Sequence, residues 1–390
     1  MRYRLTIPAR INILGNPTDA NEGDFATITA AVEIRAGGIA EKYEGLLLEV
    51  GPRTAFEPEN QKRDSVQCLE WKQAQLPLPY TGQLDLLKAA INRLAQFSSE
   101  FRQKFRPDLG QGVRLAVWSE VPRQSGLGGS SLFVLIALAA LREVYQLDRR
   151  KHHDYFLAEL AQRVEGKELG IACGFADRYA PLFGGLAYLD YRGKLYQKEI
   201  CEEPLVTYER LDAWVEDLPL LVITTGIQHE SGDVHGRMRP RYLQEHAEWV
   251  HRGGSPPNLV RLMSDTYETA WRGKIALLQG DLAAFGSLMN RNHQLVNEMM
   301  EACGFQDGAG WANNLFIQAA LENGALGAKL TGAGDGGSVF ALTEPGKEED
   351  LRQIWEYTAK QYGLTSAHIF HPQIARQGLL VEEIRDPQQK

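Results

Sequence analysis

The chain has 390 residues, of which 44% are apolar, and this is enough for a large buried core and more than one domain. Its net charge of −8 and its pI near 5.7 exclude a protein that binds nucleic acid through a basic surface. An anionic substrate would therefore need a local cluster of arginines.

The sequence shows no sign of secretion, a membrane span or a zinc finger. The first residues, MRYRLTIPARINILG, lack the long apolar core of a signal peptide, and the longest apolar stretch, 132–141, is too short to cross a bilayer. The four cysteines match no zinc-binding spacing; they are Cys68, Cys173, Cys201 and Cys303. We therefore expect a reduced, cytoplasmic protein that binds neither nucleic acid nor membrane.

The first half of the chain mixes predicted strands and helices. Residues 2–15, 26–43 and 45–51 read as strands, with the last two paired, and 84–101 has helical spacing. A strand at 112–122 stops at Pro122. Ser130 or Ser131 would cap a helix over 132–146, and Asp154 would open another over 154–169. A strand or hairpin follows at 183–193.

The second half alternates in the same way. A buried strand is expected at 218–226, and helices at about 258–279, 281–302 and 311–324. Residues 326–343 read as strand, glycine loop and strand, and 347–363 as a final helix. Because strands and helices are interleaved in both halves, we expect two α+β domains, residues 1–200 and 201–390.

The segment between the strand at 112–122 and the next helix reads QSGLGGSS, residues 124–131. Its glycines can bring backbone N–H groups to an oxyanion without a Cβ in the way. The helix that follows would point its positive end at the same place. The segment is neither a Walker A loop nor a dinucleotide fingerprint, and taken alone it could also be an ordinary capped turn.

Three further segments extend this pattern. KLTGAGDGGS, residues 329–338, is a second glycine-rich turn between apolar strands. PARINILGNPTDANEG, residues 8–23, places Arg10, Asn16 and Asp19 within a strand pattern. In EGKELGIACGFADRYAPLFGG, residues 165–185, Glu165 is followed by a second acid, Asp177. The reading depends on whether the fold brings these distant segments together.

Three of these segments, PARINILGNPTD, PRQSGLGGSS and KLTGAGDGGS, resemble in this order the motifs of the GHMP kinase superfamily of galactokinase, homoserine, mevalonate and phosphomevalonate kinases. The resemblance implies an α+β, two-domain GHMP kinase fold, with a ribosomal-protein-S5-domain-2-like N-terminal domain and a ferredoxin-like C-terminal domain. Two departures stand out: Gly129 replaces the usual first serine of the loop, and Asn16-Pro17-Thr18-Asp19 lacks the histidine of galactokinases.

GNPTD at 15–19, ELGIACGFADRYAPLFGGLAYLDY and SGDVHGRMRPRY make the chain most similar to the glucuronokinase branch. That branch phosphorylates the anomeric hydroxyl of D-glucuronate with ATP. The resemblance therefore implies an ATP- and Mg²⁺-dependent sugar kinase, as a monomer or homodimer. The runners-up are a galactose- or fucose-type 1-kinase, a heptose-phosphate kinase, and a catalytically silent relative that binds sugar and nucleotide.

The resemblance also implies roles for single residues. Asp177 matches the catalytic base, and Arg10 the basic residue that keeps it a carboxylate. Ser130 and Glu165 match the Mg²⁺ ligands, whereas we expect Glu168 on a solvated helix face. The ATP phosphates would lie against Pro122, Gln124, Ser125, Gly126, Leu127, Gly128, Gly129, Ser130 and Ser131, and against Thr331, Gly332, Ala333 and Gly334.

The sugar would be held by polar and charged side chains. Asn16 and Asp19 match positions that bind sugar hydroxyls, and Arg178 and Arg237 are candidates for the uronate carboxylate. From the residues alone, the alternatives are that Asp177 lies in a surface turn and Arg10 at a strand edge. We further expect most of the HGRMRPRY arginines on an exposed face, no catalytic role for His235, and a solvent-exposed Asp335.

Overall fold

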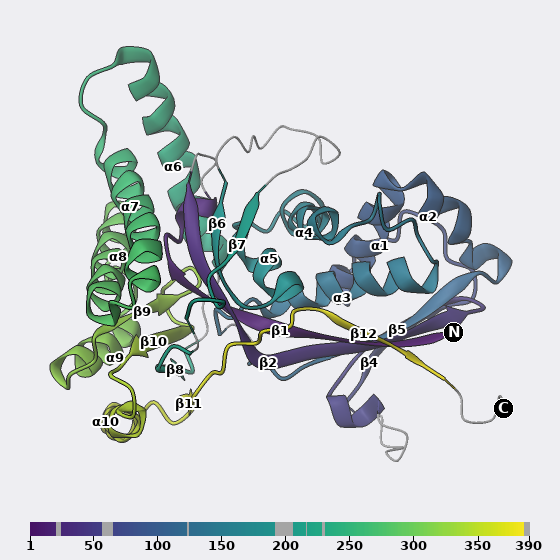
Figure 1. Ribbon diagram of the computed structural model, residues 1–390. Coiled ribbons are helices and arrows are strands. Elements are labelled where there is room, and N and C mark those ends of the chain that lie inside the picture. The colour runs from purple at the N-terminus through teal and green to yellow at the C-terminus, as the bar shows by residue number, and fades with distance from the viewer. Residues whose placement is uncertain are drawn as a thin grey trace.

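The computed structural model describes residues 1–20, 25–56, 65–122, 125–191, 206–215, 217–227 and 231–385. These residues form two sheets, each with helices packed on it, so the fold is α+β as expected (Figure 1). In the described part of the chain, no helix has the length and hydropathy needed to span a bilayer.

The first sheet has eight strands among the described residues, and β2 lies near its centre. The strands follow the order β12-β1-β2-β5-β3-β4, while β6 pairs with β2 and β7 pairs with β6. Their bounds are β1 Arg2–Leu14, β2 Ala26–Tyr43, β3 Leu46–Val50, β4 Gln67–Trp71, β5 Gly112–Ser119, β6 Leu186–Asp190, β7 Thr207–Arg210 and β12 Leu380–Ile384. The last strand thus returns to the first sheet.

The expected pairing of the strands at 26–43 and 45–51 is wrong, because β5 lies between them. β2 pairs with β5 antiparallel, and β3 pairs with β5 parallel. The chain crosses the start of β5 at Gly45, whose carbonyl occupies the place where a Cβ of residue 112 would be. Gly112 therefore permits the crossing, a role that strand periodicity alone does not reveal.

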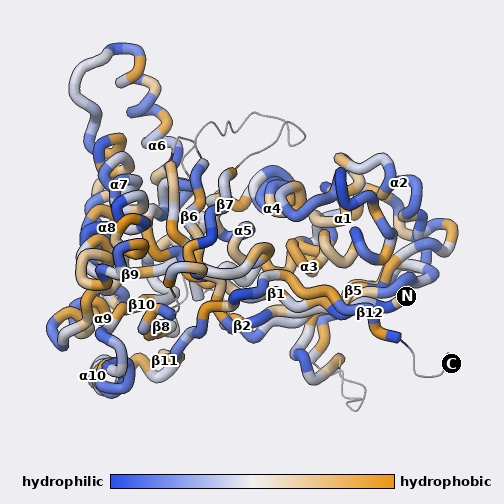
Figure 2. Tube along the Cα trace, in the orientation of Figure 1, coloured by the Kyte–Doolittle hydropathy of each residue, from blue (hydrophilic) through white to orange (hydrophobic). Residues whose placement is uncertain are grey.

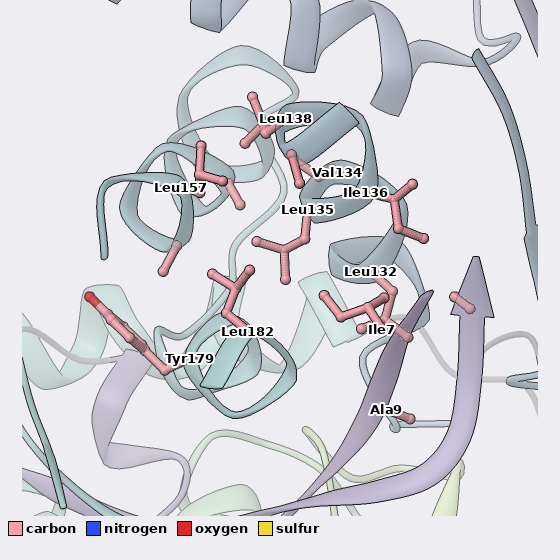
Figure 3. Packing of buried hydrophobic residues seen from close by; sticks show 14 of the residues in the cluster. Ile7, Ala9, Leu132, Val134, Leu135, Ile136, Leu138, Leu157, Tyr179 and Leu182 are labelled. Carbon is pink, nitrogen blue, oxygen red and sulfur yellow. The ribbon is translucent and has the colours of Figure 1, made fainter. Parts of the chain in front are cut away.

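The apolar helix α3 and the short helix α5 pack directly on the first sheet, α1 and α4 pack against α3, and α2 packs against α1. The α3 run LFVLIALAAL is core, as expected (Figure 2), and Leu132 lies next to Ile7 of β1 (Figure 3). The helices are α1 Asp85–Phe97, α2 Ser99–Lys104, α3 Gly129–Val144, α4 Asp154–Arg163 and α5 Ala176–Phe183, with a π-helical turn Val164–Glu168 after α4. Short 3₁₀ turns lie at Thr18–Ala20, Arg53–Phe56 and Pro107–Leu109.

The second sheet has four strands in the order β11-β8-β10-β9. Its strands are β8 Leu220–Thr224, β9 Gly327–Thr331, β10 Ser338–Leu342 and β11 His368–Phe370. The remaining helices are α6 Ser231–Arg252, α7 Asn258–Leu278, α8 Leu282–Ala302, α9 Trp311–Glu322 and α10 Glu348–Gln361. Helices α6, α7 and α8 stand together at one end of the molecule, and α9 and α10 pack on the second sheet (Figure 1).

Several local expectations need correction. The N-cap of α4 is His153, whose ring accepts the N–H of Phe156, rather than Asp154. Helix α6 was not expected. The domain boundary near residue 200 stays a prediction, since β7 still belongs to the first sheet and β8 begins the second.

Candidate active site

A cavity of about 820 Å³ lies between β1, the start of α3 and the turn after β9. It is lined by segments from every motif that the sequence singled out. The expected site residues on its wall are Arg10, Asn16, Asp19, Pro122, Ser125, Gly126, Gly128, Gly129, Ser130, Ser131, Glu165, Asp177, Arg178, Gly332 and Ala333. The fold therefore brings the two glycine turns and the acid–arginine pair together.

The two glycine turns touch each other. Gly126 has φ of 73°, and a Cβ on it would lie 2.7 Å from the carbonyl oxygen of Thr331. Gly332 has φ of 86°, and its Cβ would lie 2.9 Å from the Cα of Gly126. Both positions need glycine, for the backbone angle and for the close approach.

The first turn leads directly into α3, whose N-cap is Gly128 with φ of 88°. The backbone N–H groups of the first helical turn have no intrahelical acceptor, and they carry the positive end of the helix dipole. In the same wall the Ser125 hydroxyl is buried and has no hydrogen-bond partner among the described residues. Leu127, which was expected at the site, does not line the cavity: its side chain is fully buried in the core and its carbonyl accepts the Arg10 N–H. The turn is thus equipped to bind an anion.

Ser130 and Ser131 do not cap α3, contrary to expectation, because the helix begins at Gly129 and both serines lie in its first turn, where their hydroxyls bind a carboxylate. Each donates to Glu165 over 2.8 Å, Ser130 to Oε1 and Ser131 to Oε2. The buried guanidinium of Arg178 pairs with Oε2 as well. Glu165 therefore stands at the start of α3, held from both sides.

The competing acid, Glu168, lies elsewhere. It accepts from the Tyr80 hydroxyl over 2.7 Å and pairs with Arg93 over 2.6 Å. It does not line the cavity. The geometry thus favours Glu165 over Glu168 as the acid beside the phosphate turn.

Asp177 is held by two groups from β1. The Nε of Arg10 donates to Oδ1 over 2.7 Å, and the Asn12 amide donates to the same oxygen over 3.0 Å. Burial tends to raise the pKa of Asp177, but the charge and hydrogen bond of Arg10, together with Arg178, hold that pKa well below its usual range. Asp177 is therefore a carboxylate at neutral pH.

Asp19 lies at the N-terminus of α5, the helix that carries Asp177. Its Oδ2 accepts the backbone N–H groups of Phe175 and Ala176 over 2.8 and 2.9 Å. Burial and the nearby Asp177 raise the pKa of Asp19. A Cβ on Gly174 would overlap this carboxylate, so the glycine makes room for it.

Some expected site residues lie outside the cavity. Arg237 is half-exposed on α6, where it pairs with Asp233 over 2.7 Å and stacks on Phe305. Gly334 packs against Met300, and Asp335 is exposed, as expected. Gln124 lies outside the described residues.

Thr331 is buried below the wall rather than part of it. Its hydroxyl accepts the backbone N–H of Asn12 over 3.1 Å, so the second turn is tied to β1. The role of Thr331 in the site is therefore to hold the turn in place.

Sequence reasoning missed two residues at this site: Asn12 bonds to Asp177, and Lys329 lies behind the wall. His235, for which no catalytic role was expected, lies on the wall. Asn12 lies two residues after Arg10, which points to the same face of a strand, and this spacing was the available signal. No comparable signal marks Lys329 as buried.

Comparisons with known proteins agree with this geometry. Residues 85–185 match the family model for the N-terminal domain of GHMP kinases, and residues 274–361 match the model for their C-terminal domain. A galactokinase of Thermococcus kodakarensis is 32% identical over 270 residues, covering 65% of this chain and 71% of that protein. Glucuronokinase 1 of Arabidopsis thaliana is 27% identical, covering 88% of each chain. A crystal structure of Lactococcus lactis galactokinase with galactose superposes with a TM-score of 0.72 at 18% identity, covering 97% of this chain and 95% of that one.

Proposed function

Because the chain belongs to the GHMP kinases and is a phosphotransferase with a hydroxyl acceptor, we propose that it transfers the γ-phosphoryl group of ATP to the anomeric hydroxyl of D-glucuronate. One observation carries the proposal. The Asp177–Arg10 pair lines the same cavity as two glycine turns that touch each other. A phosphate on the turns and a sugar on the acid would therefore meet in one space.

Asp177 would receive the proton of the attacking hydroxyl. With its pKa held low, it is a weak base, so it accepts the proton only as the hydroxyl becomes acidic on forming the new P–O bond. Arg10 keeps the carboxylate oriented, and its charge stabilises the negative charge that develops during transfer. Asn12 fixes the same oxygen from the side of β1.

The first turn fits the phosphates of ATP. The unpartnered, buried Ser125 hydroxyl and the N–H groups at the start of α3 supply donors where an anion would lie. Ser130 Oγ and Glu165 Oε1, 2.8 Å apart, are the hard oxygen donors that suit Mg²⁺. When bound there, Mg²⁺ would neutralise charge on the phosphates. Arg178 keeps Glu165 in place.

The sugar would lie against Asp19 and Asn16. Both backbone bonds of Asp19 fall on Oδ2, so Oδ1 is the oxygen that can accept a sugar hydroxyl. Arg178 lines the cavity and remains a candidate to bind the uronate carboxylate. Arg237 lies outside the cavity and pairs with Asp233, so it is no longer a candidate. The 27% identity to a glucuronokinase over 88% of both chains supports the uronate.

A second candidate substrate is a neutral hexose, as for a galactose- or fucose-type 1-kinase. The observation that favours it is that both arginines on the wall are already paired, Arg10 with Asp177 and Arg178 with Glu165. A carboxylate would have to compete for a guanidinium that is already neutralised. A neutral sugar has no such requirement.

A panel of free sugars decides between these candidates. Purified protein with ATP and Mg²⁺ is assayed on D-glucuronate, D-galacturonate, D-galactose, L-fucose and a heptose 7-phosphate, and the product is identified by ³¹P NMR as a 1-phosphate or another ester. We expect the highest kcat/KM on D-glucuronate. Turnover of neutral hexoses alone would support the assignment as a sugar kinase but contradict D-glucuronate as its substrate. No turnover of any sugar by the wild type would favour a silent relative.

A further inference from the structure

Lys329 is a fully buried lysine immediately behind the cavity wall, and the mechanism above does not use it. It lies on β9, three residues before Gly332, the first glycine of the second turn. Its ammonium donates to the Asn16 side-chain oxygen over 3.0 Å, to the Leu330 carbonyl over 2.8 Å and to the Asn12 carbonyl over 3.4 Å. Its nitrogen therefore joins β9 to the part of β1 and the following loop that lines the cavity.

The surroundings of Lys329 contain no opposite charge. Within the described residues, no carboxylate lies at ion-pair distance from its nitrogen. Phe340 of β10 presents its ring 5.3 Å away, and β1 presents the uncharged Asn12 and Asn16. From α8, His293 faces the site, and burial, with the lysine as a second cause, lowers the His293 pKa to about 4, so it is neutral. The buried charge is thus held only by dipoles, which is uncommon unless it has a use.

The orientation of the Asn16 amide indicates a function for Lys329. An ammonium can only donate hydrogen bonds, so the amide must turn its oxygen, the acceptor, toward Lys329. The amide nitrogen then faces the second turn and donates to the Gly332 carbonyl over 3.3 Å. Since an amide nitrogen carries two hydrogens, one N–H remains available on a residue that lines the cavity.

We propose that Lys329 is a positioning residue, which orients the Asn16 amide so that its second N–H donates to an oxygen of the sugar. The inference rests on the proposed function, because it assigns Asn16 to the sugar. A second contact supports the assignment: Asn292 of α8 accepts the Gly15 N–H over 2.8 Å and donates to the Asn16 carbonyl over 3.2 Å. With the backbone of Asn16 fixed in this way, Lys329 determines the direction of its side chain.

The orientation depends on protonation. Burial lowers the pKa of Lys329 from its ordinary value of 10.5 to about 7. A neutral amine can accept as well as donate, so it no longer excludes the flipped amide, which would turn an oxygen toward the sugar in place of the N–H. Sugar binding should therefore weaken as the pH rises through the neutral range, whereas nucleotide binding should not.

The test uses steady-state kinetics on the sugar that the wild type phosphorylates best. We expect Lys329→Met to raise the KM for the sugar about tenfold or more, while the KM for ATP changes less than about twofold. In the wild type, the sugar KM should rise between pH 6 and pH 9. It should be independent of pH in Lys329→Met, and Lys329→Arg should restore a low, pH-independent KM.

Lys88→Met is the matched control. Lys88 is equally buried, but it pairs with Asp85 on α1 and does not line the cavity, so neither KM should change. If Lys329→Met does not fold, Lys329→Gln and the pH profile of the wild type give the same answer. An unchanged KM for the sugar in Lys329→Met, or equal increases in the KM values for sugar and ATP, would overturn the inference without contradicting the proposed kinase activity. A wild type that phosphorylates no sugar would overturn both.

Discussion

Replacing Lys329 by methionine should change how the free energy of unfolding depends on pH. The pKa of the buried ammonium is about 7 in the folded protein, below its ordinary value of 10.5. At low pH the folded protein must therefore bury a charged ammonium, which lowers the free energy of unfolding. Below pH 7 this destabilisation has its full size. The cost falls as the pH rises from 7 toward 10.5, because the unfolded chain binds more protons than the folded one over that range.

The size of the effect follows from the two pKa values. Each tenfold change in the proton-binding equilibrium corresponds to about 1.36 kcal/mol. Between pH 7 and pH 9, the free energy of unfolding of the wild type should therefore rise by about 2 kcal/mol relative to that of Lys329→Met. All other groups titrate in both proteins, so their contributions cancel in the difference. Lys329→Gln should give the same difference as Lys329→Met, because both side chains are uncharged.

Urea unfolding of the three proteins at pH 7, 8 and 9, followed by circular dichroism, measures this difference. The m-values should agree between variants, so that the midpoints report stability. A difference between wild type and Lys329→Met that stays constant from pH 7 to pH 9 would refute the reasoning. It would mean that Lys329 keeps an ordinary pKa or is not buried.

Three further predictions concern the site itself. Asp177→Asn should lower kcat about 10²- to 10⁴-fold with little change in the KM for ATP; a loss below about tenfold in steady-state assays would remove the acid as the proton acceptor. Glu165→Gln should remove the nearer carboxylate of the buried Arg178, leaving it only Asp177 at 4.0 Å, and lower the free energy of unfolding by about 3–5 kcal/mol in urea titrations; a variant as stable as wild type would contradict the buried pair. Gly174→Ala should displace the Asp19 carboxylate and raise the sugar KM about tenfold, with the ATP KM as the internal control.

The elements with strong local patterns were predictable from sequence. The apolar run after the first glycine turn could only be a buried helix, and α7, α8, α9 and α10 lie within a few residues of their expected bounds. Helix α6 was missed because Pro240 lies inside it and its residues are mostly polar; the available signal was the four-residue spacing of the buried Val234, Met238 and Tyr242. The β2–β3 pairing was wrong because a short connection does not exclude a third strand between two neighbours.

The site residues whose roles follow from the sequence motifs were predictable, and the remaining ones were not. The glycine turns and Asp177 came from sequence motifs, and the cavity unites them. Arg237 was misplaced because an arginine-rich run on a helix carries no information about which member faces a cavity. Lys329 was missed for the opposite reason: lysine is usually exposed, and a strand buried on both faces gives no alternation to contradict that. Such residues are identified by tertiary contacts, which the sequence does not display.

The pairing of β12 with β1 bears on how the protein is made. During synthesis β1 leaves the ribosome long before β12, so one edge of β1 has no strand beside it until residues 380–384 have emerged. An exposed strand edge can pair with other chains, which makes this interval the one in which a nascent molecule is most prone to aggregate. β12 covers Arg2–Thr6 of the same strand that carries Arg10, so a segment from far along the chain protects the strand that holds the proposed catalytic arginine.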